Sequence, residues 1–328
     1  MHPATCARLG ELIGTAVTTA HDLGGQHGVR HYRLSLADGR SAFAKVVGNG
    51  LDGAAAARRA AAERGLAGAP GGSSSQTDSL AGGSGGSSPQ ANTAGFAAEA
   101  AGLRWLAESD ATAVPLVLAC TGDCLVIDWI EAGQPSRDAA VRFGHELAGL
   151  HAVGADRFGA PWPGAIAGLP LDNEARDDER WTDWYAARRV LPYARLGRDA
   201  GTLTAADVAV IESACARFAD VAGPAEPPAR LHGDCWSGNV LWSGGRGWLI
   251  DPAAHGGHRE TDLAMLALFG APYLTEILAA YTDAAPLADG WRGRLPLHQL
   301  HPLLVHVCLF GAAYRGAALA AARAVLAS

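Results

Sequence analysis

Two carboxylates and an amide near one short stretch have the types and spacing needed to hold a divalent cation and to move a proton. Asp234 and Asn239 belong to the stretch Leu231–Asn239, and Asp251 follows it. Residues 240–250 form an apolar run, a glycine-rich turn and a second apolar run, which predicts a strand, a tight turn and a strand. Oxygen ligands that converge from the entry and the exit of such a hairpin suit a hard divalent cation. A further carboxylate nearby can accept a proton from a hydroxyl.

The spacing His-x-Asp-x-x-x-x-Asn with a later Asp is the arrangement of the catalytic loop and the metal-binding Asp in kinase-fold phosphotransferases. His232, Asp234, Asn239 and Asp251 match it. The alternative is a surface hairpin in which Asp, Asn and Gly only form turns. Three matches at these spacings favour the phosphotransferase interpretation. Such an enzyme also needs elements that hold a nucleotide.

The elements expected upstream of this loop are a helix at 5–16 and a small antiparallel sheet. Alternating apolar and polar side chains predict a strand at 29–36, and an Asp-Gly turn leads into a return strand at 41–47. Gly24 and Gly25 precede these strands, where glycines let backbone amides approach a phosphate closely. Because loops commonly contain such clusters, the two glycines support a nucleotide site only together with other residues.

Lys45 and Glu99 are the candidates for positioning nucleotide phosphates. Lys45 lies in an apolar strand, where a charged side chain needs a partner. It either holds phosphates, oriented by a glutamate of a following helix, or is an edge lysine whose charged end reaches water. Glu99 is the best partner in the sequence. Its alternative is a solvated residue in the first turn of a helix, where the helix dipole favours it.

An unusual segment separates Lys45 from Glu99. Residues 51–64 are rich in Ala and Arg and are predicted to be helical. Residues 65–95 are rich in Gly and Ser, and they cannot bury enough apolar surface to offset the entropy lost on ordering. Disorder is therefore expected for about 65–95, and order is expected to resume at Phe96.

A further pair of strands, at 114–118 and 125–131, is predicted to lead into a loop at 132–135 that connects two lobes. An adenine would be read there by backbone groups of Asp128, Trp129 and Ile130. Beyond this loop the chain is expected to be mostly helical apart from the hairpin. One helix would end near His151, and a last one would span about 301–326.

Two other stretches have alternative interpretations. Residues 172–189 mix carboxylates with Trp184 and Tyr185, and they would form either an acidic rim with aromatic walls for a cationic substrate or an amphipathic helix with the aromatic residues inward. The cluster after Asp251 allows a zinc site and a metal-dependent hydrolase, but its histidines lack companions at ligand spacing. Asp262 is expected instead to cap backbone amides and to support the catalytic loop. The residues of this cluster are His255, His258, Glu260 and Asp262.

Composition limits the remaining possibilities. Hydrophobic residues make up 49% and charged residues 18% of the 328, which is typical of a globular chain long enough for two lobes. The net charge of −7 gives no support for a nucleic-acid partner. Neither a signal pattern nor a membrane-spanning run of about 20 uncharged apolar residues is expected. The six scattered cysteines are expected to be reduced, in a cytoplasmic protein.

The motifs resemble those of the fructosamine kinase (ketosamine-3-kinase) family, a branch of the kinase-like fold near the aminoglycoside and choline kinases. The resemblance covers nearly the whole chain apart from residues 51–95. Cys235 departs from the family pattern, in which leucine is usual. The most specific motif is His232-Gly233-Asp234-x-Trp236-Ser237-Gly238-Asn239, and others are Asp251-Pro252-Ala253, Gly257-His258-x-Glu260-x-Asp262, Leu268-Phe269-Gly270 and His306-x-x-Leu309-Phe310-Gly311.

This resemblance implies a role for each candidate. Trp236 and His232 are expected to contact the substrate. The other expected roles are Asp234 as the base, Asn239 and Asp251 as Mg²⁺ ligands, and Lys45 and Glu99 as the pair that positions the phosphates of ATP.

The predicted fold is α+β and protein-kinase-like. It has a small N-terminal antiparallel-sheet lobe that binds ATP at 1–131 and a larger, mostly helical catalytic and substrate lobe at 132–328. The predicted reaction is ATP-dependent phosphorylation of a sugar hydroxyl on a small-molecule or protein-bound ketosamine, which implies deglycation repair. The alternatives are a kinase of an aminoglycoside, choline-like amine or aminosugar, which would share the catalytic residues, and a catalytically silent nucleotide-binding protein.

Overall fold

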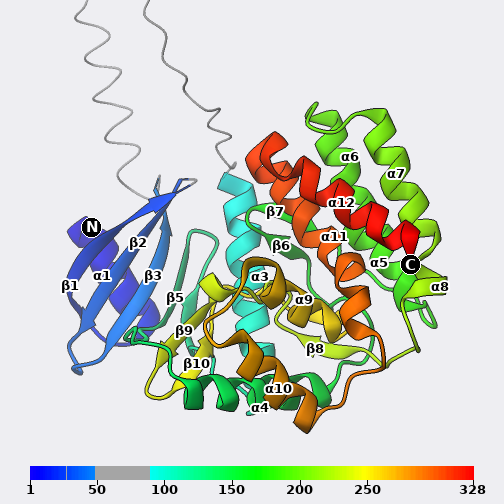
Figure 1. The fold of residues 1–328 in the computed structure, drawn as a ribbon. Coiled ribbons are helices and arrows are strands. Elements are labelled where there is room, and N and C mark those ends of the chain that lie inside the picture. The colour runs from blue at the N-terminus through cyan, green and yellow to red at the C-terminus, as the bar shows by residue number, and fades with distance from the viewer. Residues whose placement is uncertain (27, 49–88) are drawn as a thin grey trace, which may run out of the picture. The chain divides into compact units, whose positions relative to one another are not determined.

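The computed structural model describes residues 1–26, 28–48 and 89–328. The described chain divides into two compact units, Met1–Ala97 with Val117–Trp129, and Ala98–Leu116 with Ile130–Ser328. The first contains an antiparallel sheet and the second contains most of the helices, so the fold is α+β as predicted (Figure 1). The lobe boundary expected after residue 131 remains a prediction.

The first unit, as far as it is described, is built on a five-stranded antiparallel sheet with the order β1-β2-β3-β5-β4. Alternate residues of β3, such as Ala42 and Ala44, are buried against Leu9 of α1 and Leu34 of β2, while the residues between them face the other side of the sheet. The elements are α1 (Pro3–Ile13), β1 (Val17–Gln26), β2 (Val29–Leu36), β3 (Ser41–Val47), β4 (Val117–Cys120) and β5 (Cys124–Asp128).

Helix α3 (Pro89–Ala107) begins in the first unit and ends in the second. Its first residues fall in the stretch that was expected to be disordered, so that expectation is wrong for residues 89–95. The earlier part of that stretch, and the helix expected at 51–64, lie outside the described residues.

The second unit is mainly helical, and one hydrophobic core joins its helices between residues 181 and 221 to its last two helices. Helices α11 and α12 lie against α6 and α7, with Leu300 and Leu304 of α11 fully buried (Figure 1). Trp184 and Tyr185 are also fully buried, so the interpretation of residues 172–189 with inward aromatic residues is correct. The helices are α4 (Arg137–Val153), α5 (Trp181–Tyr185), a π-helical turn (Ala186–Val190), α6 (Leu191–Asp199), α7 (Ala205–Ala216), α8 (Phe218–Val221), α9 (Glu260–Phe269), α10 (Leu274–Ala284), α11 (Trp291–Phe310) and α12 (Arg315–Ala327).

The expectation of a mostly helical second part is confirmed, but two short strand pairs besides the hairpin also occur in this unit. Three-residue strands show no usable periodicity in a sequence, which is why they were missed. The pairs are β6 (Gly164–Ile166) with β7 (Leu169–Leu171), β8 (Ala229–Leu231) with β11 (His255–Gly257), and the predicted hairpin of β9 (Val240–Ser243) with β10 (Arg246–Leu249).

The helix expected at about 301–326 is in fact two helices. A 3₁₀ turn at Gly311–Tyr314 separates α11 from α12, and Gly311 has the positive φ of 70° that commonly ends a helix. The stretch Trp291–Ala327 is also long and apolar enough, by length and composition alone, to cross a membrane, so the expectation that no such run exists is wrong. Its residues Leu304 and Val307 lie in the core of the second unit, as in the core helix of a globular protein.

Candidate active site

The hairpin brings the two ends of the predicted catalytic stretch together within the second unit. The amide of Ile250 donates to the carbonyl of Asn239 at 3.0 Å, so Asp251 follows directly beside the turn that contains Asn239. That turn is a short 3₁₀ segment, Ser237–Asn239. Asp234 lies near these two residues because strand β8, which ends shortly before Asp234, pairs with strand β11, which begins shortly after Asp251.

Asp234 is half-buried and is held by one neighbour. The side-chain nitrogen Nδ2 of Asn239 donates to Oδ2 and to the backbone carbonyl of Asp234, both at 2.9 Å. Burial raises the pKa of Asp234 to about 7, and the negative charges of Asp251 and Asp262 also raise it. The hydrogen bond from Asn239 lowers the pKa but does not outweigh these effects. A carboxylate with such a pKa can accept a proton near neutral pH.

The donor set around Asp234 fits a hard divalent cation. Because Nδ2 of Asn239 is used by Asp234, the amide oxygen of Asn239 is the atom that can serve as a ligand. Asp251 adds a carboxylate, and its positive φ of 53° belongs to a region that non-glycine residues seldom adopt. Two repelling carboxylates and an amide oxygen form an all-oxygen set of the kind that Mg²⁺ prefers.

Asp262 lies at the start of α9 but binds the catalytic loop rather than the amides of its own helix. Its carboxylate accepts hydrogen bonds from the amides of His232 at 2.7 Å and Gly233 at 3.0 Å. His232 is fully buried, its Nε2 contacts the carbonyl of Ile250 at 2.9 Å, and its Nδ1 accepts from the amide of Asp234 at 3.3 Å. The expected substrate contact of His232 is therefore corrected, because its ring lies inside the protein and ties the loop to the hairpin.

Gly233 can be replaced only at a high cost, which gives a first prediction. Its φ is +81°, and a Cβ atom there would overlap the carbonyl of Ala253. We expect Gly233→Ala to lower the unfolding temperature and to reduce kcat at least tenfold, since the loop that carries Asp234 must move. Gly245→Ala is the matched control, because Gly245 also has a positive φ, of +73°, but open space around it. The free energy of unfolding of Gly245→Ala should fall only by about 1–2 kcal/mol, the cost of a non-glycine residue in a left-handed conformation, and its kcat should not change. Equal kcat values in the two variants would contradict the prediction.

Trp236 is exposed next to the catalytic residue. Its side chain is 38% exposed, and its ring packs edge-on against Phe269 with centroids 5.8 Å apart. The indole lies so close to Gly238 that a Cβ atom there would overlap the ring. Because Gly238 has no Cβ atom, the indole of Trp236 can lie over the turn that contains Asn239. The substrate contact expected for Trp236 remains a prediction.

Lys45 lies in the first unit on β3, the middle strand of the sheet. It pairs in register with His31 of β2 and Leu125 of β5, so the alternative of an edge lysine is wrong. Its half-buried side chain is on the same face as Phe43 and opposite the face that packs against α1. Its role toward phosphates remains a prediction.

The glycine pair lies within β1 rather than in a turn before the sheet. Gly24 has a φ of +92°, and its amide donates to the carboxylate of Asp22 at 2.8 Å. A Cβ atom on Gly25 would overlap the carbonyl of Val29. The positive φ therefore favours glycine at position 24 and the close pairing of β1 with β2 requires glycine at position 25, while a contact with nucleotide phosphates remains a prediction.

The other expected nucleotide contacts are distributed over both units. In the first unit, the amide of Trp129 donates to the carbonyl of Ser41 at 3.3 Å, and Asp128 is the last residue of β5. In the second unit, Glu99 is half-buried on α3, one helical turn before Gly102. Gly102 in turn faces Pro252 and Ala254, which follow Asp251 in the chain. The roles of Glu99, Asp128, Trp129 and Ile130 remain predictions.

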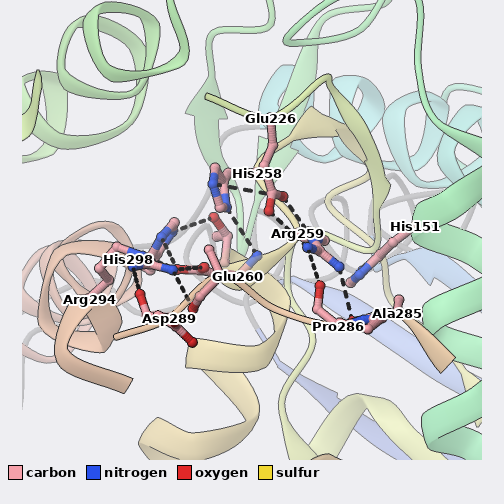
Figure 2. A network of polar contacts seen from close by, with 12 residues as sticks. His151, Glu226, His258, Arg259, Glu260, Ala285, Pro286, Asp289, Arg294 and His298 are labelled. Carbon is pink, nitrogen blue, oxygen red and sulfur yellow. Dashed lines mark hydrogen bonds and ion pairs between the residues drawn. The ribbon is translucent and has the colours of Figure 1, made fainter. Parts of the chain in front are cut away.

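A second polar cluster, around α9 and α11, brings His258 and Glu260 of the zinc interpretation together with His298. The ligand atoms of His258, Glu260 and His298 lie within 4.8 Å of one another. Figure 2 shows that Arg294 already neutralises Glu260, since its guanidinium donates to the two carboxylate oxygens at 2.9 and 2.5 Å. Burial alone would raise the pKa of Glu260, but hydrogen bonds from His298 and Arg294 outweigh it and lower the pKa to about 2. The cluster is an internal ion pair that joins α9 to α11.

Comparisons with known proteins identify the family of this chain. A sequence model of the fructosamine kinase family matches residues 87–328. A relative from Synechocystis named "Probable ketoamine kinase" is 35% identical over 231 residues, which cover 67% of this chain and 75% of the relative. The crystal structure of a "putative fructosamine-3-kinase" from Thermobifida fusca YX-ER1 is 44% identical, with a TM-score of 0.83 and 100% of each chain covered.

A more distant structure extends the comparison of the fold. The aminoglycoside phosphotransferase APH(4)-Ia, in a ternary complex with AMP-PNP and hygromycin B, is 15% identical with a TM-score of 0.60 and covers 99% of this chain and 100% of its own. At that identity the likeness concerns the fold alone, and it confirms the predicted protein-kinase-like class. On the family match and the identities together, this chain is a phosphotransferase that belongs to the fructosamine kinase family.

Proposed function

We propose that this protein transfers the γ-phosphoryl group of ATP to a sugar hydroxyl of a ketosamine, an amine that carries an Amadori-type sugar. The observation that carries the proposal is the convergence of Asp234, Asn239 and Asp251 at the base of one hairpin, beside the exposed ring of Trp236. The ketoamine kinase name of its relatives supports the acceptor class.

Asp234 is the base of the proposed reaction. It accepts the proton of the attacking hydroxyl while the new oxygen–phosphorus bond forms and the bond between the γ-phosphorus and ADP breaks, and its Oδ2 is held in place by Asn239. Asn239 and Asp251 hold Mg²⁺, which when bound neutralises the charge that the phosphates carry. Because phosphoryl transfer depends mainly on positioning and charge stabilisation, no covalent enzyme intermediate is needed.

Lys45 and Glu99 orient the phosphates of ATP in this proposal. Lys45 has the position that such a residue requires, on the central strand of the sheet and on the face away from the core. The backbone of Asp128, Trp129 and Ile130 contacts the adenine. The proposed physiological role is repair: a phosphorylated ketosamine is less stable and releases the amine, so the reaction removes a sugar from a small or protein-bound amine.

A substrate panel tests the acceptor class. Purified protein with Mg·ATP is offered fructosamines, ribulosamines, free aminosugars and aminoglycosides, and phosphoryl transfer is followed for each. We expect transfer to the first two. Activity confined to aminosugars or aminoglycosides would overturn the ketosamine proposal and leave a kinase of another small molecule. If Mg·ATP is not consumed with any acceptor, the catalytically silent alternative is correct, and stabilisation against heat by Mg·ATP then tells whether the protein still binds the nucleotide.

Trp236 gives a prediction about the acceptor. We expect Trp236→Ala to raise the KM for the ketosamine about tenfold, because an aromatic contact is worth roughly 0.5–1.5 kcal/mol beyond its buried area, and to leave the KM for ATP unchanged. Gly238→Ala should act in the same direction while keeping the tryptophan, since its Cβ atom would displace the indole. An unchanged acceptor KM in both variants would exclude Trp236 as a substrate contact.

A further inference from the structure

A chain of buried hydrogen bonds runs from the catalytic loop into the body of the second unit. Its first member is Asp262, which is fully buried and accepts the amides of His232 and Gly233 with its two carboxylate oxygens. These amides belong to the two residues immediately before Asp234. The position of the Asp262 carboxylate therefore determines where the backbone of the catalytic loop lies.

The second member is His151, which comes from the last turn of α4. Its Nε2 lies 3.2 Å from Oδ2 of Asp262, the same oxygen that accepts the amide of His232. An ionised carboxylate can only accept hydrogen bonds, so Nε2 must carry a hydrogen and donate it. Burial alone would raise the pKa of Asp262, but the hydrogen bonds from His151 and from the His232 amide help to outweigh burial and lower it, which keeps the carboxylate ionised.

The third member is Tyr281 of α10, which sets the hydrogen position on His151. Its hydroxyl oxygen lies 2.8 Å from Nδ1 of His151. In a neutral imidazole that donates through Nε2, the other nitrogen is an acceptor, so the Tyr281 hydroxyl donates to it. Both side chains are buried. Tyr281 thus selects the tautomer of His151 that can hold Asp262.

The outer end of this chain meets a cavity of about 680 Å³ that His151, Tyr281, Arg230 and Arg259 help to line. The charged groups there already have protein partners. Arg259 donates to both oxygens of Glu226, at 2.7 and 2.8 Å, and to the carbonyls of Ala285 and Pro286 (Figure 2). Arg230 donates to the carbonyl of Trp105. The arginines of the cavity are thus bound by protein groups, and the hydrogen-bond chain lies on the inner side of His151.

We infer that His151 is a positioning residue for phosphoryl transfer: with Tyr281 it fixes the Asp262 carboxylate, which fixes the loop amides and so the direction of Asp234. The role in transfer rests on the proposed function, whereas the effect on the loop does not. Displacement of a reacting group by about 1 Å can cost about 100-fold in rate. Loss of the bond to Asp262 should therefore lower kcat more than it changes either KM.

Two substitutions of His151 separate its two hydrogen bonds. In His151→Gln the side-chain nitrogen reaches the place of Nε2, so the donor to Asp262 is kept and the bond to Tyr281 is lost. In His151→Asn the amide reaches only the place of Nδ1, so the bond to Tyr281 is kept and the donor to Asp262 is lost. We expect kcat to fall about tenfold or more in His151→Asn, with both KM values within about threefold of the wild type. His151→Gln should keep a kcat at least tenfold higher than His151→Asn.

Amide hydrogen exchange in the loop is a readout that needs no substrate. Exchange of the backbone amides of His232 and Gly233 should speed up in His151→Asn and stay near the wild-type rate in His151→Gln. His298→Asn is the control for the loss of a buried imidazole: His298 is equally buried and contacts Thr261 at 3.0 Å, outside this chain. It should lower the unfolding temperature without changing kcat or exchange in the loop.

The outcomes separate this inference from the proposed function. Equal kcat and equal loop exchange in the Gln and Asn variants would overturn the positioning role. A fall in kcat that follows only the unfolding temperature, in His298→Asn as in His151→Asn, would also overturn it and leave a structural role for His151. If the wild-type protein phosphorylates no ketosamine, the proposed function fails, and the exchange rates still decide whether His151 holds the loop.

Discussion

Replacing Asp234 by Asn is expected to lower kcat by about 10²–10⁴-fold, the range that a general base contributes. The amide has nearly the same shape as the carboxylate and its oxygen can still accept from Nδ2 of Asn239, so the loop should keep its conformation. The KM values and the stabilisation by Mg·ATP should change far less than kcat. Full ATP-dependent transfer by this variant would remove Asp234 from the mechanism.

The same substitution should stabilise the protein when neither nucleotide nor metal is bound. Burial raises the pKa of Asp234 from 3.8 to about 7, so the native state binds this proton more tightly than the unfolded state does. Stability from this group is fully present below the unfolded pKa and is lost as pH rises through 7. At pH 8 the neutral amide of the Asp234→Asn variant carries no such penalty, and the variant should unfold at a higher temperature than the wild type. A lower unfolding temperature at pH 8 would contradict the assigned environment of Asp234.

A steep loss of stability in mild acid is the second large effect that we expect. His255 and His258 are buried, and burial lowers the pKa of each from 6.5 to about 3. The unfolded chain therefore binds protons below pH 6.5 that the native state does not bind, so stability is full above 6.5 and falls as pH falls toward 3. At pH 5 each histidine lowers the free energy of unfolding by about 2 kcal/mol, and the two together lower it by about 4 kcal/mol. That is a large share of a typical stability of about 5–15 kcal/mol.

Asp234 works against this loss in the wild-type protein. Native Asp234 takes up a proton between pH 8 and pH 5. By the same relation, this uptake raises the free energy of unfolding by up to about 3 kcal/mol. The histidine effect should therefore be clearest in Asp234→Asn, whose free energy of unfolding should fall more steeply between pH 7.5 and pH 5 than that of the wild type. Chemical denaturation at several pH values, without metal or nucleotide, measures both slopes. Equal slopes, or a flat profile in the variant, would contradict the assignment.

The catalytic loop was predictable because its chemistry is encoded locally. Asp234 and Asn239 lie on one loop, and the apolar runs on either side of Gly244-Gly245 specify a two-residue hairpin turn that returns the chain to Asp251. Within such a short span, spacing alone brings side chains together. The central place of Lys45 in the sheet was not predictable in this way, because it depends on β5, which pairs from far along the chain.

His232 shows where sequence reasoning about single residues failed. Next to the catalytic Asp in a motif, it was expected to face the substrate, but its ring is buried and contacts the carbonyl of Ile250. Of the residues on which the loop depends, Asp262 was predicted from its motif, but His151 gave no local signal. His151 is 111 positions from Asp262, and in the sequence it was only the end of an apolar helix face.

By itself, the sequence determined the class of chemistry and the sheet-and-helix division, because these follow from residue types at short spacing and from periodicity. Only the tertiary structure decided which buried polar groups meet: His151 with Asp262, and Glu260 with Arg294 rather than with a metal. The physical reason is that a buried charge is tolerated only with a partner, and the partner is supplied by whichever helix packs beside it, not by a neighbour in the chain.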